Sequence, residues 1–491
     1  MSDSPLYTSL EGLPVFLTGI KGTGMAALAE LLAKRGASVS GSDTSEKFYT
    51  DEVLKRYHIP YAERFAAENI PTGTRLVVYS AAYNPDENPE LLRARELGIP
   101  VLVYPDALGL LSQLADSSGI SGVHGKTTTT ALAGTILKSL RFPASVLAGS
   151  AVSTFEDSST LVQGEKYFVA ETCEYRRNFL SFNPTRIVVT SVEPDHLDYF
   201  RDYEDILDAF VAYGERLPRG GELVYCADDR GAAEVAQRLL ARRPDVHAVP
   251  YGTEAEGVFR ITEIVTEPGR SRFRLAGFSR DFALRIPGRH TVLDAVAAIA
   301  LAVLLVEKER GAVTAADVAA IAAGVEAFAG SRRRCEIVGE TQGVLFMDDY
   351  AHHPTAIRTT LEGLRGFYPG RRLVVDFMSH TYSRTEALLA ELSESFGAAD
   401  MVILHKIYAS AREKSGRVTG EDLFRRTAAH HPNVHYFNEV MDAFDFCRGA
   451  LTSGDLFLTM GAGNNWVLGR ALHDALAGSN GASIGARGGL A

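Results

Sequence analysis

A glycine-rich turn between an expected strand and an expected helix constrains this chain more than any other feature. It follows the small and apolar stretch 119–121 and precedes a helical pattern from Thr129 to Leu140. Glycine lets backbone N–H groups close around phosphate oxygens, and the N-terminus of the following helix adds positive potential. The turn consists of Gly122, Val123, His124, Gly125, Lys126, Thr127 and Thr128.

The residue types in this turn indicate a nucleoside triphosphate. Lys126 can reach the β- and γ-phosphates, and the Thr127 hydroxyl can hold Mg²⁺. The turn departs from the general phosphate-loop pattern at Ile120, six residues before Lys126, where that pattern has glycine. The alternative is a structural turn with a surface lysine, but the coincidence of glycine, Lys-Thr and strand–helix context favours ATP or GTP.

The composition is that of a globular protein. At 491 residues the chain is long enough for about three domains, and no apolar run approaches the length of a membrane-spanning helix. A formal net charge of −11 argues against general nucleic-acid binding, which needs a basic surface. The four cysteines have no CxxC spacing, and the N-terminus lacks the basic region of a signal peptide. We expect a cytoplasmic protein without membrane insertion, present as a monomer or a weak homodimer.

Residues 1–112 are expected to form a first α/β domain around a parallel, doubly wound sheet, because apolar runs alternate with helical patterns. The turn after its first strand is again glycine-rich, and an acid follows about 20 residues later, where it could accept a hydrogen bond from ribose. These residues are Gly19, Gly22, Gly24 and Asp43. Structural use of the glycines in helix–strand packing is the alternative. The strands are expected at 13–19, 37–43, 75–80 and 99–104.

Residues 113–332 are expected to form a second domain around the phosphate loop. Two strands, 167–171 and 186–191, should end beside that loop, where ligands bind in open α/β sheets. Glu171 closes the first of them and His196 follows the second, so the pair could hold a divalent cation; capping by His196 is the alternative. Short strands are expected within 222–285 and a buried helix within 293–307.

Residues 333–491 are expected to form a third domain with a second doubly wound sheet. Two acids and two histidines follow its first strand, in the run from Asp348 to Pro354, and indicate a loop that faces a ligand, because buried unpaired charges are costly. A basic cluster, 332–334, lies at the boundary and suits phosphate, with a solvated charge run as the alternative. The strands are expected at 344–347, 373–377, 401–404 and 456–460, and disorder from about residue 478.

Taken together, these motifs resemble the Mur ligase family, the ATP-dependent ligases of bacterial peptidoglycan precursor synthesis. The resemblance covers roughly residues 12–475, with the motifs in order. Besides the two glycine-rich turns, it rests on the following segments: Pro287 to His290, Phe328 to Arg334 (FAGSRRR), Asp348 to Thr355 (DDYAHHPT), His380 to Thr385 (HTYSRT) and Gly461 to Asn464 (GAGN).

The resemblance implies three domains: an N-terminal Rossmann-like domain for a UDP-linked substrate, a central P-loop domain for ATP, and a C-terminal Rossmann-like domain. It implies that ATP drives the joining of L-alanine to UDP-N-acetylmuramate through an acyl phosphate. The roles it implies are catalysis by Lys126, Arg333, Asp349 and His352, ATP binding by the phosphate loop with His290 and Asp294, UDP-substrate binding by Gly19, Gly22, Gly24 and Asp43, amino-acid binding by His380 and Arg384, and Mg²⁺ binding by Thr127, Glu171 and His196.

Several positions depart from the family's pattern. Val123 and Ser191 replace Thr and Asn, Cys173 replaces an acid, Thr291 and Asp294 replace two Asn residues, and Met378-Ser379 replaces Gln-Pro. An ionised Asp294 could accept from the adenine amino group but could not donate. The alternative within the family is the ligase of cell-wall recycling, which joins UDP-N-acetylmuramate to a tripeptide. A nicotinamide dehydrogenase and a non-catalytic nucleotide-binding protein are more distant rivals.

Overall fold

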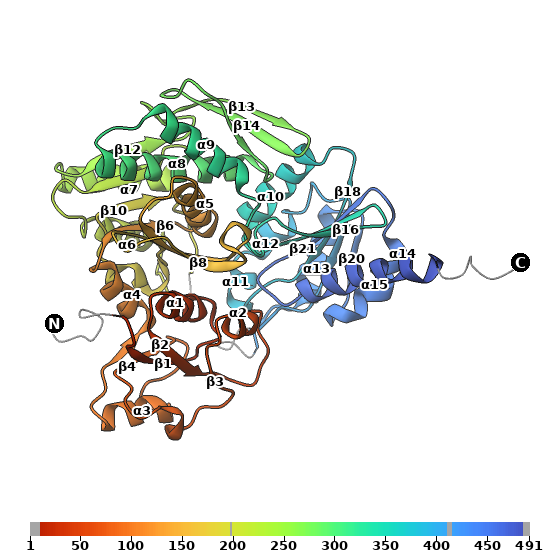
Figure 1. The fold of residues 1–491 in the computed structure, drawn as a ribbon. Helices are drawn as coiled ribbons and strands as arrows, with labels where there is room; N and C mark the ends of the chain where they lie inside the picture. Colours follow the sequence, from red (N-terminus) through yellow and green to blue (C-terminus); the bar gives the residue numbers. More distant parts are fainter. Residues whose placement is uncertain (1–9, 197–198, 410–414, 485–491) are drawn as a thin grey trace, which may run out of the picture.

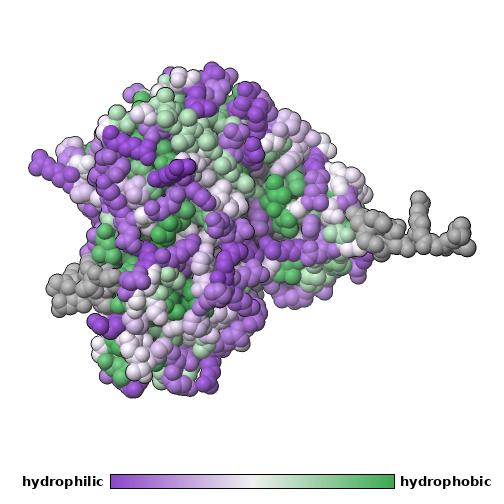
Figure 2. All heavy atoms as spheres, viewed as in Figure 1, coloured by the Kyte–Doolittle hydropathy of each residue, from purple (hydrophilic) through white to green (hydrophobic). Residues whose placement is uncertain are grey.

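A computed structural model describes residues 10–196, 199–409 and 415–484 (Figure 1). Its strands form three α/β sheets and one small antiparallel sheet. The sheet nearest the N-terminus lies at the bottom of Figure 1, the phosphate-loop sheet above it, and the C-terminal sheet to the right. The face in Figure 2 is hydrophilic over most of its area, with scattered hydrophobic patches, as expected when the apolar strands are covered by helices.

The first sheet is parallel throughout, in the order β3-β2-β1-β4-β5. Helix α1 (Thr23–Lys34) starts directly after β1, so the first glycine turn lies between strand and helix, as predicted. Helices α2 (Thr50–Arg56), α3 (Pro89–Glu96) and α4 (Tyr104–Ser112) complete the unit. The strands are β1 (Pro14–Thr18), β2 (Ser38–Ser42), β3 (Tyr61–Ala62), β4 (Leu76–Tyr79) and β5 (Val101–Val103).

The second sheet has the order β12-β11-β10-β6-β9-β7-β8 and is parallel except for β8 at its edge. Helix α5 (Lys126–Ser139) leaves the central strand β6, and α6 (Tyr203–Gly214) and α7 (Arg230–Arg242) follow β10 and β11. The strands are β6 (Asp116–Ser121), β7 (Ala144–Val152), β8 (Ser158–Val162), β9 (Tyr167–Glu171), β10 (Arg186–Val189), β11 (Glu222–Cys226) and β12 (His247–Tyr251).

The expected buried helix is α8 (Arg289–Arg310), which packs on α5 together with α9 (Ala315–Ala327). Its length and hydropathy would suit a membrane span, but 83% of its apolar window is buried inside the protein. The apolar side chains of α8 therefore form part of the hydrophobic core of the second unit. The small antiparallel sheet precedes it, with β13 (Ile261–Glu267), β14 (Arg270–Leu275) and β15 (Phe282–Leu284).

The third sheet has the order β16-β17-β21-β18-β19-β20 and is parallel except for β16. Helix α10 (Pro354–Phe367) starts after β17, and α11 (Tyr382–Ala387), α12 (Leu389–Ser393), α13 (Gly420–His430), α14 (Phe444–Ala450) and α15 (Trp466–Ile484) complete the unit. The strands are β16 (Glu336–Thr341), β17 (Val344–Asp349), β18 (Arg372–Phe377), β19 (Met401–Leu404), β20 (Val434–Tyr436) and β21 (Asp455–Met460).

The C-terminal segment differs from the expectation of disorder from about residue 478. Helix α15 continues to Ile484, so residues 478–484 are helical, and 485–491 lie outside the described residues. No proline interrupts this segment, and extending an existing helix costs far less than starting one. Glycine and serine content alone was therefore a poor indicator of where the helix ends.

A buried carboxylate joins the first two units. Glu30 on α1 is fully buried, and its carboxylate accepts hydrogen bonds from the hydroxyls of Ser158, Ser159 and Thr160 at the start of β8. Lys34, one turn later, lies 2.7 Å from the same carboxylate and donates to the Thr160 carbonyl. A buried charge with one cation and several donors is fully partnered, so this contact fixes the first unit against the edge of the second sheet.

Candidate active site

The phosphate loop connects β6 to α5 in a conformation that requires both of its glycines. Gly122 has φ +140° and Gly125 has φ +80°. A Cβ on Gly122 would lie 2.1 Å from Thr190 Oγ1, and one on Gly125 would lie 2.3 Å from Asp294 Oδ1. Ile120, where the general pattern has glycine, is a fully buried residue of β6. The departure at that position therefore falls in the strand and not in the turn.

Lys126 is held at the start of α5 by a buried acid that the sequence reasoning did not select. Its Nζ lies 2.9 Å from Glu174 Oε2 and donates to the carbonyls of Gly122 and Val123. Burial lowers the pKa of Lys126, but the neighbouring acidic groups, Glu174 foremost, together outweigh burial and raise it above its ordinary value. Burial likewise raises the pKa of Glu174, but Lys126 and His196 together bring it below the ordinary value. Both side chains are therefore charged at neutral pH.

Two of the three expected magnesium ligands lie together. The Thr127 hydroxyl donates to Glu171 Oε2 at 2.8 Å, at the end of β9. Gly149 of β7 faces this carboxylate, where a Cβ would lie only 2.2 Å from Oε2. His196 lies beside a different acid: its Nε2 is 3.5 Å from Glu174 Oε1, and its ring packs on Tyr175. Glu174 thus links Lys126 to His196, three residues after the acid that sequence reasoning selected.

A cavity of about 230 Å³ lies between the first glycine-rich turn and the end of β9. Glu171 and Cys173 line it from the second sheet, and Thr23, Gly24 and Tyr104 line it from the first unit. Gly24 is needed at this position, because a Cβ would come within 3.0 Å of the Tyr104 ring. A molecule held by the first turn can therefore extend toward Glu171 and the phosphate loop.

The acid that follows the first glycine-rich turn, Asp43, is hydrogen bonded to neighbouring protein groups. The Asp43 carboxylate accepts hydrogen bonds from the Lys21 amide at 2.7 Å, the Thr44 amide at 2.8 Å and the Tyr83 hydroxyl at 3.0 Å. Gly19 has φ +83°, and a Cβ there would lie 2.5 Å from the Tyr83 ring. Asp43 therefore shapes this turn in addition to any contact with ribose.

The second turn of α8 brings Asp294 against the phosphate loop at Gly125. Asp294 is 6% exposed, and its Oδ1 is 3.3 Å from the Thr129 hydroxyl. Burial raises the pKa of Asp294 to about 8, so the carboxyl group is protonated at neutral pH and can donate a hydrogen bond. Burial also lowers the pKa of His290, which precedes it on the same helix. The expectation of an acceptor-only Asp294 applied to the ionised form alone.

The two acids that end β17 are buried and hold the following loop. The Asp349 carboxylate accepts from the amides of Cys335 and Ala351, both at 2.7 Å. Asp348 Oδ2 pairs with Arg333 Nε at 3.0 Å, and Arg333 also donates to the Gly461 carbonyl at 2.8 Å. Burial raises the pKa of Asp348 to about 6. These contacts of Arg333 and Asp349 all lie within the third unit.

Arg384 connects the third unit to the strand ends of the second. Its Nη2 lies 3.1 Å from Asp195 Oδ1, in the loop that follows β10. Burial raises the pKa of Asp195, but Arg384 and the neighbouring histidines together outweigh it and lower that pKa below the ordinary value. His352, which lies near both, is kept neutral because burial lowers its pKa. His380 stacks on Tyr408 at 5.9 Å.

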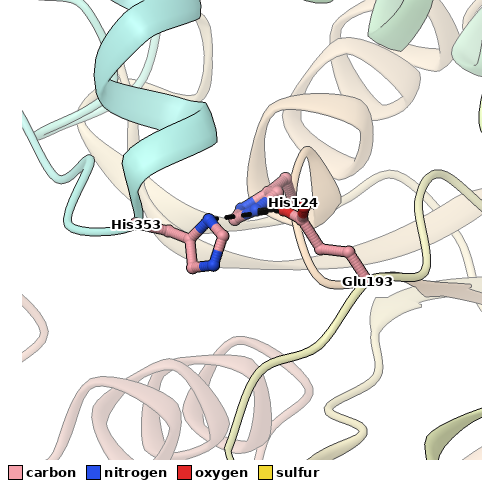
Figure 3. A group of neighbouring side chains, drawn as sticks. All are labelled: His124, Glu193 and His353. Atoms are coloured by element: carbon pink, nitrogen blue, oxygen red, sulfur yellow. Dashed lines mark hydrogen bonds and ion pairs between the residues drawn. The ribbon is translucent and has the colours of Figure 1, made fainter. Parts of the chain in front are cut away.

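A further group meets where the second and third units approach (Figure 3). His124 Nε2, in the phosphate loop, is hydrogen bonded to Glu193 Oε1, and His353 Nδ1 lies 3.5 Å from the same oxygen. His353 is the N-cap of α10. Sequence reasoning selected only His124 of these three, although Glu193 lies in the strand-end run before His196 and His353 is the second of two adjacent histidines.

Comparison with known proteins covers nearly the whole chain. Three family models match it: Mur ligase family, catalytic domain, at residues 15–115; Mur ligase middle domain at 120–302; and Mur ligase, glutamate ligase domain, at 333–463. The chain is 52% identical to the UDP-N-acetylmuramate–L-alanine ligase of Treponema pallidum (strain Nichols) over 473 residues, 96% of this chain and 98% of that protein. It is 38% identical to the ligase of the same name from Borreliella burgdorferi, over 94% of this chain and 98% of that protein.

Solved structures show the same fold. The crystal structure of UDP-N-acetylmuramate-alanine ligase from Thermotoga maritima matches 95% of this chain and 100% of its own length, with a TM-score of 0.77 at 22% identity. A murein peptide ligase from Psychrobacter arcticus matches 95% of this chain and 99% of its own length, with a TM-score of 0.65 at 22% identity.

Proposed function

The chain belongs to the Mur ligase family, and from that premise we propose that it is an ATP-dependent ligase that joins L-alanine to UDP-N-acetylmuramate in peptidoglycan precursor synthesis. The observation that carries this proposal is 52% identity, over nearly the full length of both chains, to a ligase of that name. The cavity beside the first glycine-rich turn supports it, because it extends to Glu171, which contacts Thr127 of the phosphate loop.

The reaction needs an activated carboxylate, since a free carboxylate repels nucleophiles. An oxygen of the lactyl carboxylate attacks the γ-phosphorus of ATP, ADP leaves, and an acyl phosphate forms. The amine of alanine then attacks the acyl carbon, phosphate leaves with the C–O bonding electrons, and the amine loses a proton. One ATP is thus converted to ADP and phosphate for each amide bond formed.

Lys126 and the loop amides supply the charge for the first step. Negative charge grows on the β- and γ-phosphate oxygens as the bond to ADP breaks, and fixed donors in a partly dry site stabilise it strongly. The Glu174 carboxylate keeps Lys126 protonated and aimed along the loop. Gly122 and Gly125 allow the loop to pack against Thr190 and Asp294 in this conformation, because a Cβ at either position would collide with those side chains.

Magnesium fits the oxygen atoms on the β9 side of the loop. Thr127 Oγ1 and Glu171 Oε2 are adjacent, and Gly149 leaves space in front of the carboxylate. Mg²⁺ prefers such oxygen ligands with phosphate and water. Thr127 and Glu171 would hold the ion, with His196 brought in through a shift away from Glu174. When bound, Mg²⁺ neutralises charge on the phosphates that the carboxylate must approach.

The three units have separate tasks in this proposal. The first domain, 1–112, holds the UDP portion through the turn from Gly19 to Gly24. The second, 113–332, holds ATP. The third, 333–491, brings alanine, whose carboxylate is bound by His380 and Arg384. After closure, three further residues of this domain face the nucleotide: Arg333, Asp349 and His352. Exclusion of water by closure protects the acyl phosphate from hydrolysis.

A phosphate-release assay tests the function directly. We expect release that requires ATP, UDP-N-acetylmuramate and an amino acid together, with L-alanine preferred over glycine and L-serine. The tripeptide of cell-wall recycling serves as a competing acceptor. Release that is faster with tripeptide than with L-alanine would replace the proposal by the recycling ligase, and release without UDP-N-acetylmuramate would contradict both.

A further inference from the structure

The group His124, Glu193 and His353 has a chemical composition unlike the rest of the active site. The three ligand atoms, two imidazole nitrogens and one carboxylate oxygen, lie within 4.8 Å of one another (Figure 3). The residues come from the phosphate loop, the loop after β10 and the start of α10. Two imidazoles and one carboxylate form a ligand set typical of catalytic zinc sites, which keep a fourth position open.

From this convergence we propose that His124, Glu193 and His353 bind a divalent transition-metal ion of the Zn²⁺ or Co²⁺ class, separate from the magnesium of ATP. The ion would tie the phosphate loop to the first turn of α10. It would lie where the two ring nitrogens already converge on one carboxylate oxygen, and it would replace the hydrogen bond between His124 and Glu193.

The distances suit a small tetrahedral ion. With metal–ligand bonds of about 2.0–2.1 Å, the ligand atoms of a tetrahedral site lie about 3.3 Å apart. His353 Nδ1 and Glu193 Oε1 are 3.5 Å apart, which is close to that separation. His124 Nε2 lies nearer to Glu193 and would move outward. The ring centroids of the two histidines are 5.2 Å apart, so both nitrogens can reach one ion.

The protonation states favour metal binding at neutral pH. Burial lowers the pKa of His353, so its ring is neutral and offers a lone pair. Burial raises the pKa of Glu193, but His124, His353 and Thr355 together outweigh it, so the pKa lies below its ordinary value and the carboxylate is charged. The nearby charges are Asp229, Asp195 and Arg384, which add two acids and one base around the site.

An outer contact already orients the central ligand. The Thr355 hydroxyl donates to Glu193 Oε2 at 3.3 Å, which leaves Oε1 directed at the two histidines. Such outer partners fix the orientation of metal ligands. The Thr355 amide lies 3.4 Å from His353 Nδ1, a long hydrogen bond that coordination would replace. The site therefore needs small side-chain adjustments and no change in the path of the backbone.

Cobalt binding tests the proposal independently of catalysis. We expect the full chain, without nucleotide, to bind one Co²⁺ with the visible absorption of a low-coordinate site and to retain it in excess Mg²⁺, because imidazole selects transition metals over magnesium. Glu193→Gln and His353→Asn should each weaken Co²⁺ binding by more than about 10-fold. Losing a residue that only orients a metal ligand already costs about 10-fold in metal affinity, and these two residues would be ligands themselves. Asn keeps an N-cap acceptor for α10.

The matched control is His430→Asn, which removes an exposed histidine on α13 whose neighbouring acid, Glu394, lies 3.9 Å away. It should bind Co²⁺ as the unmodified chain does. Circular dichroism of each variant excludes unfolding as the cause of a loss. Absence of Co²⁺ binding by the unmodified chain, or unchanged binding by both Glu193→Gln and His353→Asn, overturns the proposal.

Discussion

The phosphate loop has two flanks of opposite chemistry. Toward β9 it meets oxygen atoms and a buried acid, in Thr127, Glu171 and Glu174. Toward β10 and α10 it meets two imidazoles around one carboxylate, in His124, Glu193 and His353. The first flank suits a hard cation such as Mg²⁺, and the second suits a transition metal or a shared proton.

The difference shows how one sheet edge can support two tasks. The β9 flank is built within the second unit and faces the cavity shared with the first unit, so its charges are in place before the third unit contributes anything. The β10 flank is completed by a residue from α10 of the third unit. We infer that the first flank takes part in the chemistry on phosphate. The second flank forms only when the third unit lies against the second, so its formation depends on the position of the third unit.

The largest effect should follow from removing the positively charged Lys126 side chain from the β9 flank. Lys126→Ala should lower alanine-dependent phosphate release by about 10³-fold or more, because a fixed positive charge at the transferring phosphate is lost. It also leaves the buried Glu174 without its cation, a change that costs about 3–5 kcal/mol for fully buried pairs. Steady-state assay and urea unfolding measure the two effects.

The double variant Lys126→Ala/Glu174→Gln separates these two effects. Neutralising the acid should recover most of the lost stability while activity stays absent. A double variant that turns over at a rate near that of the unmodified chain would show that Lys126 acts only as the partner of Glu174, and would remove the β9 flank from the chemistry.

The second effect concerns the magnesium requirement, which should change when the β9 flank is altered and stay the same when the β10 flank is altered. Glu171→Gln should raise the Mg²⁺ concentration needed for half-maximal activity by about 10-fold or more, because a charged oxygen ligand becomes neutral. Glu193→Gln should leave that Mg²⁺ requirement unchanged within about twofold. Activity measured across a magnesium titration checks both. Equal shifts in the two variants would show that the flanks form a single cation site.

The third effect concerns Asp294, which supports the loop from α8 between the flanks. Its pKa in the folded protein is about 8, which is above its ordinary value of about 4. As pH rises through this range, the carboxyl group ionises in the unfolded chain before it ionises in the folded protein. The folded protein therefore loses stability between about pH 4 and pH 8. Asparagine does not titrate. Asp294→Asn should therefore be more stable than the unmodified chain by about 1–3 kcal/mol at pH 8, and the gain should shrink toward pH 5. Urea unfolding at both pH values measures this difference.

A pH-independent difference between Asp294→Asn and the unmodified chain would contradict the buried, protonated carboxyl. The matched control is Asp317→Asn, because Asp317 caps α9 and pairs with Arg310, and its pKa lies below the ordinary value. Asp317→Asn should be destabilising, and the loss should diminish as pH falls through the folded pKa, which is the opposite sign.

Much of this arrangement could be predicted from the sequence, because it follows from local patterns. Strand-forming apolar runs flanked by polar residues placed Tyr167–Glu171 and Met401–Leu404 with the bounds that the structure gives. Glycine spacing located both turns, and the strand-end rule located Glu171 near Thr127. Each of these predictions depends on residues close together in the chain or on one edge of one sheet.

The remaining features depend on contacts between distant segments. Helix α7 (Arg230–Arg242) lies in a region expected to hold only short strands, since its charged surface masks the buried stripe that packs on the sheet. Glu193 meets His353 across 160 residues of chain, and no local pattern sets that approach. The protonated state of Asp294 depends on burial against α5, which spacing along the chain does not reveal.

The smallest effect should come from Val123, which lies in the loop between the two flanks. Its amide donates to the Ser191 carbonyl at 2.9 Å, and its carbonyl accepts from Lys126 Nζ at 3.2 Å. Both contacts use the backbone, so the side chain can change without loss of either. Val123→Thr should therefore alter the KM for ATP by less than about twofold and the free energy of unfolding by less than about 0.5 kcal/mol. A large change in the KM for ATP, with stability unchanged, would instead show that the side chain at this position contacts the nucleotide.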